Sequence, residues 1–390
     1  MDTKIFMYTG KGGVGKSSIS SATAILSAKR KKTILISIDP AHSLSDIFDI
    51  KIGGEITEVS DNLSVIEFDG LKILEEKFPD IKNTLSDKFR KIDFSKLTYT
   101  SSLDMPFIVN ILSLIKILDI YEQGIYENII VDCPASAATF AYLKYPEMLS
   151  WYLEKFFGVG KGIIRTLRPI SKYKYKINLP DKESLDKVEI VYQRLLKLEK
   201  ILKDSSIATV RLVGLCEKMV IEESKRDLAY LNLFDFNIDG FFVNRLLEDD
   251  ESEFIKRRIE IQEKNLGEIA KIFYNIPIYK IKLMKKDMKS IDDLRDFADK
   301  LGAYEDLVTI KALESGHVYE KSGLGYLLKI RVDDVEDVEV SKTNSDINIR
   351  LNSVSRIISL PNLLIDTYIK SYELKDGFLI IYLEKSGELI

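Results

Sequence analysis

Short apolar runs separated by amphipathic stretches fill most of the first 300 residues. The runs are five to seven residues long and rich in Val, Ile and Phe, as expected of strands buried on both faces. They are KIFMY (Lys4–Tyr8), TILISI (Thr33–Ile38), LSVIEF (Leu63–Phe68), NIIVD (Asn128–Asp132), VRLVGL (Val210–Leu215), IDGFFVN (Ile238–Asn244) and PIYKIKL (Pro277–Leu283). Because helical stretches lie between them, the pattern predicts an α/β fold with a doubly wound, mostly parallel sheet.

Two longer intervals interrupt this alternation, at roughly residues 70–118 and 146–205. Both carry apolar residues at helical spacing and no run typical of a strand. We predict that they form a helical layer inserted into the α/β core. The longest apolar run, Phe107–Ile120, is too short for a membrane span and contains Lys116.

The pattern changes near residue 315. Beyond it, apolar and polar residues alternate in short segments with turns at DD, NS and KDG, which is typical of an antiparallel sheet. The segments are YLLKIRV, DVEVSK, INIRL, RIISLP and FLIIYLE. We therefore expect two domains: an α/β domain over residues 1–315 and a small all-β sandwich over residues 319–390.

Composition narrows the classes of function. The 390 residues carry a net charge of −4, so bulk electrostatics favour neither nucleic acid nor an acidic substrate. Cys133 and Cys216 are the only cysteines and form no C-x-x-C pair, which excludes a disulfide framework and a zinc or iron–sulfur site built by the thiolates of one chain. The amino-terminal segment passes directly into a predicted strand, so we expect no signal peptide and a cytoplasmic protein.

The segment TGKGGVGKSS, from Thr9 to Ser18, matches the phosphate-loop pattern G-x-x-x-x-G-K-[ST] between a predicted strand and a predicted helix. In such a loop, glycines turn backbone N–H groups toward phosphates, and the helix N-terminus favours an anion. Lys16 is expected to contact the β- and γ-phosphates of ATP, and the Ser17 hydroxyl to hold Mg²⁺. The expected nucleotide contacts are Gly10, Lys11, Gly12, Gly13, Val14, Gly15, Lys16, Ser17 and Ser18.

A second lysine, Lys11, lies five positions before Lys16. The nucleotide bound by the same loop does not require it. If two copies of the chain face each other, Lys11 of one copy would reach the phosphates bound by the other and stabilise charge during transfer, as an arginine finger does, and the family resemblance given below favours this role. The alternative is a solvated loop lysine.

These motifs resemble a known family. KGGVGKSS resembles the deviant phosphate loop of the dimeric ATPases that include ParA/MinD, nitrogenase iron protein and ArsA. ISIDPAHSLSDIF (Ile36–Phe48) resembles the first switch of ArsA, the arsenite pump ATPase, and of relatives that target tail-anchored membrane proteins. Later segments follow in the order and spacing of that family, up to about residue 305, and the segments ISLPNLL and YELKDGFLIIYL resemble an α-crystallin-type small heat-shock domain.

The resemblance implies roles for individual residues. Asp39 would orient or deprotonate the attacking water and would also belong to the metal site, and Asp132 would bind Mg²⁺ through water. Asn244 would pair with adenine, and Glu217 would contact the nucleotide. The second switch departs from the family pattern D-T-A-P-T-G-H, since this chain has D-C-P-A-S-A-A from Asp132 to Ala138. The zinc that joins some family dimers is not expected, because the C-x-x-C motif is missing.

Three roles remain open for the ATPase. In the first, closure of a homodimer shapes a groove for an apolar client, such as a membrane-protein segment, lined by residues 106–121 and 148–167; ordinary core packing explains these apolar residues equally well. The second is an arsenite or anion pump, which the shortage of cysteines weakens. The third is ParA-like partitioning on nucleic acid, suggested by seven basic and no acidic residues from Lys155 to Lys176; a solvated loop is the preferred explanation, and nucleic acid is an unlikely partner.

Overall fold

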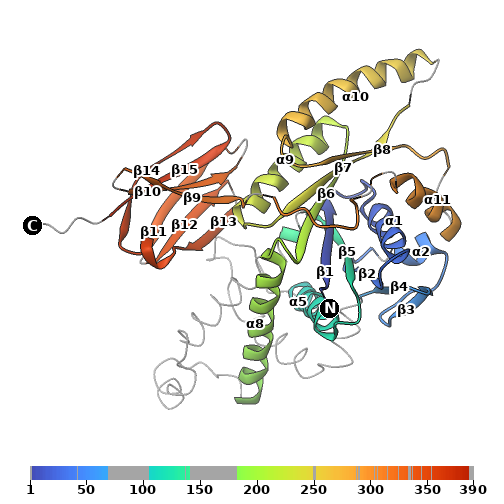
Figure 1. Cartoon of the computed structure of the whole chain (residues 1–390), viewed down its shortest axis with the longest axis horizontal. Helices are drawn as coiled ribbons and strands as arrows, with labels where there is room; N and C mark the ends of the chain where they lie inside the picture. Colours follow the sequence, from blue (N-terminus) through green and yellow to red (C-terminus); the bar gives the residue numbers. More distant parts are fainter. Residues whose placement is uncertain are drawn as a thin grey trace, which may run out of the picture.

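A computed structural model gives the fold. It describes residues 2–68, 105–140, 182–248 and 252–385, apart from single residues at 42, 137, 287, 289, 303, 305, 314, 324, 333, 334, 336, 344 and 353. Figure 1 shows an α/β body joined to a separate β-rich body. Large parts of both predicted insertions, together with Trp151 and the basic run from Lys155 to Lys176, lie outside the described residues.

The α/β body is built on one eight-stranded sheet in the order β3-β4-β2-β5-β1-β6-β7-β8. All neighbouring strands are parallel except β3 and β4. The strands are β1 (Lys4–Gly10), β2 (Thr33–Ser37), β3 (Thr57–Ser60), β4 (Leu63–Glu67), β5 (Asn128–Ala135), β6 (Ala208–Leu215), β7 (Ile238–Leu246) and β8 (Ile278–Lys282). The doubly wound parallel sheet predicted from the apolar runs is confirmed, with the short edge strand β3 added.

Helices cover both faces of this sheet (Figure 1). The described helices are α1 (Lys16–Ala28), α2 (Leu44–Phe48), α5 (Met105–Gln123), α8 (Lys182–Lys203), α9 (Lys218–Leu233), α10 (Glu253–Ile272) and α11 (Ile291–Leu301). Alternate residues of β1 separate the two faces: Phe6 and Tyr8 pack with α1 and α11, whereas Ile5 and Met7 pack in the core that contains α5, α8 and α9. This alternation is what the period-two geometry of a strand requires.

Helix α5 corrects one expectation. It contains most of the predicted groove segment 106–121, and the structure buries its apolar side chains in the core of the α/β body. The buried residues include Ile111, Leu114, Ile117, Leu118 and Ile120. This face of α5 is therefore core, so it is not free to hold a client in the conformation described. The second groove segment lies outside the described residues.

The β-rich body is the predicted sandwich of two antiparallel sheets, with orders β14-β15-β10-β9 and β11-β12-β13. Its elements are β9 (His317–Ser322), β10 (Gly325–Arg331), β11 (Val338–Thr343), β12 (Asp346–Leu351), β13 (Val354–Ser359), a 3-10 turn at Asn362–Leu364, β14 (Thr367–Lys375) and β15 (Phe378–Lys385). The first strand begins two residues before the expected start of this domain.

The sandwich packs against the α/β body beside α9 (Figure 1). The Arg356 guanidinium lies 4.8 Å from the centroid of the Phe234 ring at the end of α9. Arg331 donates to the Asn275 side chain at 2.7 Å and to the carbonyl of Ile272 at 2.6 Å. Buried cations and backbone acceptors thus fix the contact between the two bodies.

Candidate active site

The phosphate loop connects β1 to α1 at the carboxyl end of the central strand. Gly10, Gly13 and Gly15 have positive φ angles of 145°, 81° and 95°. A Cβ at Gly10 would lie 2.0 Å from the carbonyl oxygen of Val213, and one at Gly15 would lie 2.4 Å from Nδ2 of Asn244. The loop conformation therefore requires glycine at both positions.

The first turn of α1 is open to an anion. Its N-cap residue, Gly15, supplies no side-chain hydrogen bond to the helix. Lys16 is buried, and its ammonium group lies 3.3 Å from the carbonyl oxygen of Lys11, inside the loop. A cation held there next to free N–H groups of a helix N-terminus is suited to phosphate oxygens.

The two switch segments meet at Ser17. The Ser43 hydroxyl donates to the Ser17 hydroxyl at 2.9 Å, which joins the first switch to α1. Ser37, at the end of β2, donates from its hydroxyl to Asp132 Oδ2 at 3.4 Å, and it accepts from the Asp39 N–H at 3.3 Å. The carboxylates of the first and second switches therefore lie near the same hydroxyl groups.

Asp132 is fully buried, and its Oδ1 has no hydrogen-bond partner among the described residues. Burial, with a contribution from the charge of Asp39, raises the pKa of Asp132 to about 7. The carboxylates of Asp39 and Asp132, with Asp132 Oδ1 unsatisfied, and the Ser17 hydroxyl form a donor set that suits Mg²⁺. When bound, the ion would neutralise the charge of phosphate oxygens.

Glu67 is a site residue that the sequence analysis missed. Its buried carboxylate accepts from the backbone N–H groups of Leu44 and Ser45 and, at 2.8 Å, from the Ser45 hydroxyl. It thereby anchors the start of α2, the end of the first switch. A glutamate at the end of the apolar run LSVIEF was the only signal for this role.

Asn244 braces the loop. Its Nδ2 donates to the carbonyl oxygen of Val14 at 2.9 Å, and its Oδ1 accepts from the backbone N–H of Arg245 at 2.9 Å. The amide keeps one N–H and one oxygen lone pair beyond these two contacts.

Glu217 is exposed at the N-cap position of α9, where its side chain makes no capping hydrogen bond. The nucleotide contacts predicted for Asn244 and Glu217 stay predictions.

Lys11 extends in a different direction from Lys16. Its ammonium group pairs with the Glu223 carboxylate of α9 at 3.2 Å and is about one-third exposed. Ser136, in the second switch, donates to the other oxygen of Glu223 at 3.4 Å. Glu223 and Ser136 were not candidates in the sequence analysis, because no local motif links a helix residue to either loop.

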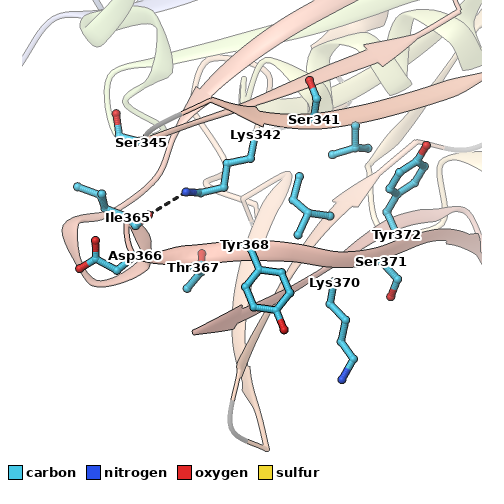
Figure 2. Close-up of a pocket in the computed structure, with 12 residues that line it drawn as sticks. Ser341, Lys342, Ser345, Ile365, Asp366, Thr367, Tyr368, Lys370, Ser371 and Tyr372 are labelled. Atoms are coloured by element: carbon cyan, nitrogen blue, oxygen red, sulfur yellow. Dashed lines mark hydrogen bonds between the residues drawn. The ribbon is translucent and has the colours of Figure 1, made fainter. Parts of the chain in front are cut away.

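A separate groove lies in the sandwich, away from this site. This groove of about 1070 Å³ runs between β11 and β14 of the sandwich, and Figure 2 shows Lys342, Tyr368 and Lys370 along it.

Among the described residues no group of three or more His, Cys, Asp or Glu side chains is placed to hold a metal ion. Burial raises the pKa of the Cys133 thiol, and it raises that of Cys216 to about 11. No described helix is long and apolar enough to cross a membrane.

Comparison with known proteins agrees with the fold and shows the family. Residues 3–303 match the family described as anion-transporting ATPase, ArsA type, and residues 325–383 match the HSP20-like domain found in ArsA. A putative arsenical pump-driving ATPase of Chlorobaculum tepidum is 33% identical over 399 residues, covering 99% of this chain and 97% of that protein. ATPase GET3 of Ajellomyces dermatitidis is 27% identical over 304 residues, covering 75% of this chain and 88% of that protein. The chain therefore belongs to the ArsA family of ATPases and carries its HSP20-like domain at the carboxyl end.

Proposed function

We propose that this protein is a cytoplasmic, Mg²⁺-dependent homodimeric ATPase whose nucleotide-driven closure controls the binding of an apolar client, such as a segment of a membrane protein. The different directions of the two loop lysines are the observation that supports the dimeric part of the proposal. Lys16 is buried within its own loop, whereas Lys11 is partly exposed and extends to α9. Because the Lys11 side chain does not contact the phosphate site of its own loop, it is available to bind the phosphates held by a partner chain.

The geometry of one site supports the following roles. Lys16 and the N–H groups at the start of α1 would bind the phosphates, and Ser17 and Asp132 would hold the metal ion. Asp39 lies just beyond the carboxyl end of β2, and its Oδ1 accepts from the Ala41 N–H at 3.1 Å, which orients the carboxylate. Its other oxygen is then available to accept a proton from the attacking water.

Complementation between inactive variants tests the dimeric part of the proposal. Lys11→Ala and Asp39→Asn chains should each be inactive alone. In a mixed dimer, one site is complete: the Lys11→Ala chain binds the nucleotide there and supplies an intact Asp39, and the Asp39→Asn chain supplies an intact Lys11. Random mixing should then restore roughly a quarter of wild-type activity, because half of the dimers are mixed and each contains one complete site. If Lys11 acts within its own chain, each site of the mixed dimer lacks one residue and no activity returns.

An arsenical pump-driving role is the second candidate. It is favoured by the names of similar proteins, which include the putative arsenical pump-driving ATPases of Chlorobaculum tepidum and Aquifex aeolicus. The chemistry is less favourable, since arsenite prefers thiolates and the chain has only Cys133, which is buried, and Cys216. Stimulation of ATP hydrolysis by arsenite, compared with stimulation by an apolar membrane-segment peptide, distinguishes the two candidates.

A further inference from the structure

Three residues form a continuous chain of contacts from the second switch to Lys11. The Ser136 hydroxyl donates to Glu223 Oε1 at 3.4 Å, and Glu223 Oε2 lies 3.2 Å from Nζ of Lys11. Each oxygen of the carboxylate therefore has one partner, one from the switch and one from the phosphate loop. Binding of phosphate within the same loop requires neither contact.

The two ends of this chain lie next to each other in the sheet. β1 and β5 are parallel neighbours, and Gly10 is in register with Ala135. Lys11 and Ser136 are the residues that follow this pair. The loop and the switch thus leave the sheet side by side, and Glu223 is placed beside both.

Glu223 itself is held by a well-packed helix. Ile221 and Ser224 of the same turn are buried, and the Ser224 hydroxyl donates to the carbonyl of Val220 at 2.8 Å. Because α9 packs on β6, the backbone of Glu223 is held in place when the switch moves. A shift of Ser136 would therefore change its hydrogen bond to Glu223 and leave the helix in place.

Asp227, one turn further along α9, competes for the same hydroxyl. It also hydrogen bonds with the Ser136 side chain, and its Oδ2 has no partner among the described residues. A hydroxyl has one proton and cannot donate to two carboxylates at once. Burial, together with the charge of Glu223, raises the pKa of Asp227 to about 7. The hydroxyl proton of Ser136 points to Glu223 in this structure, at 3.4 Å.

We propose that Glu223 is a positioning residue that holds Lys11 against its own chain, and that Ser136 links this hold to the state of the second switch. Movement of the switch withdraws the Ser136 hydrogen bond, loosens the carboxylate and releases Lys11 to cross to the partner's phosphates. The inference rests on the proposed trans role of Lys11. The second switch, D-C-P-A-S-A-A, differs from the family pattern, and this link would let it report the nucleotide state through Ser136 instead of through the family's usual residues.

The first test measures Lys11 directly in the full chain. With ADP bound, acetylation of Lys11 by a limiting amine reagent is followed by mass spectrometry. Glu223→Gln should raise the acetylation rate about threefold or more, and Ser136→Ala should raise it less, because it removes only the hydrogen bond. Glu222→Gln changes the same charge one position away and should leave the rate unchanged. Equal rates in wild type and Glu223→Gln would overturn the proposal.

The second test measures release. Dimer dissociation constants are determined by sedimentation with a non-hydrolysable ATP analogue. Glu223→Gln should tighten the dimer about threefold to tenfold, because two partly exposed ion pairs no longer have to break. The gain should vanish in a Lys11→Ala background. A weaker dimer in Glu223→Gln would show that the carboxylate supports Lys11 in the closed state. It would refute the proposal that Glu223 holds Lys11 against its own chain.

The tests separate this inference from the proposed function. Failed complementation between Lys11→Ala and Asp39→Asn chains removes the trans role itself. Successful complementation with unchanged acetylation and dimerisation in Glu223→Gln removes only the role of Glu223.

Discussion

Replacing Arg211 should destabilise the α/β domain by about 3 to 5 kcal/mol, because this side chain is a fully buried cation with several partners. Its guanidinium forms a two-point ion pair with Asp239 at 2.8 and 3.1 Å and donates to the Tyr8 hydroxyl at 2.9 Å. It also donates to the carbonyls of Leu307 at 2.5 Å and Thr309 at 3.1 Å. These last two contacts hold the segment that leads from α11 to the sandwich.

Arg211→Met keeps most of the volume and removes every donor. Among the described residues, the carboxylate of Asp239 then keeps only the Lys311 N–H as a donor, at 3.1 Å, and it stays buried. The expected loss corresponds to a decrease of roughly 10 °C in the unfolding temperature of a domain of this size. The segment 306–313 should also become sensitive to protease, because two of its carbonyls lose their donors.

Differential scanning calorimetry and limited proteolysis measure these two effects. The double variant Arg211→Met with Asp239→Leu should recover part of the loss, since no unpaired charge remains buried. Arg295→Met is the matched control: its ion pair with Asp292 is exposed, so the loss should stay below about 1 kcal/mol. A loss below about 1 kcal/mol for Arg211→Met, or unchanged cleavage of the segment, would refute the reasoning.

Three further predictions concern Asp39, Asp227 and the two cysteines. Asp39→Asn should bind ATP as tightly as wild type but hydrolyse it at least about 100-fold more slowly, since only water activation is lost; equilibrium binding and steady-state turnover check this, and undiminished turnover removes Asp39 from the mechanism. The pKa of Asp227 is about 7 in the folded state, against an ordinary value of 3.8. Between these two pH values the folded state keeps a proton that the unfolded state has lost, so the free energy of unfolding decreases as the pH rises through this window. Asp227→Asn should therefore raise the unfolding temperature at pH 8, by the equivalent of at most about 4 kcal/mol, and change it little at pH 4; equal effects at the two pH values would contradict the assignment. A zinc-selective chelator should leave dimer formation and Mg²⁺-supported ATP hydrolysis unchanged, and loss of either would give Cys133 or Cys216 a metal-binding role.

The predicted strands and the phosphate loop were recognisable because their signals are local. Seven apolar runs became strands of the sheet, since a strand buried on both faces needs consecutive apolar residues. The edge strand β3 was missed for the converse reason. Its four residues, TEVS, alternate between exposed and partly buried and contain one apolar side chain, so they have the pattern of a loop.

The apolar segment of α5 shows where a local pattern is ambiguous. Apolar residues at helical spacing identify a helix but not the surface that covers it. The tertiary structure buries this face against the sheet and α8, which converts an expected groove into core.

The sequence by itself determined the fold class and the loop expected to bind phosphate, because each depends on residues close together in the chain. The carboxylates expected near the metal were assigned from the family resemblance, at the ends of predicted strands. Only the tertiary structure decided how distant side chains are paired. Lys11 and Glu223 are 212 positions apart, and Arg211 and Leu307 are 96 apart, so their contacts depend on the packing of helices and strands. Spacing along the chain carries no information about such pairs, since side-chain contacts depend on distance in space.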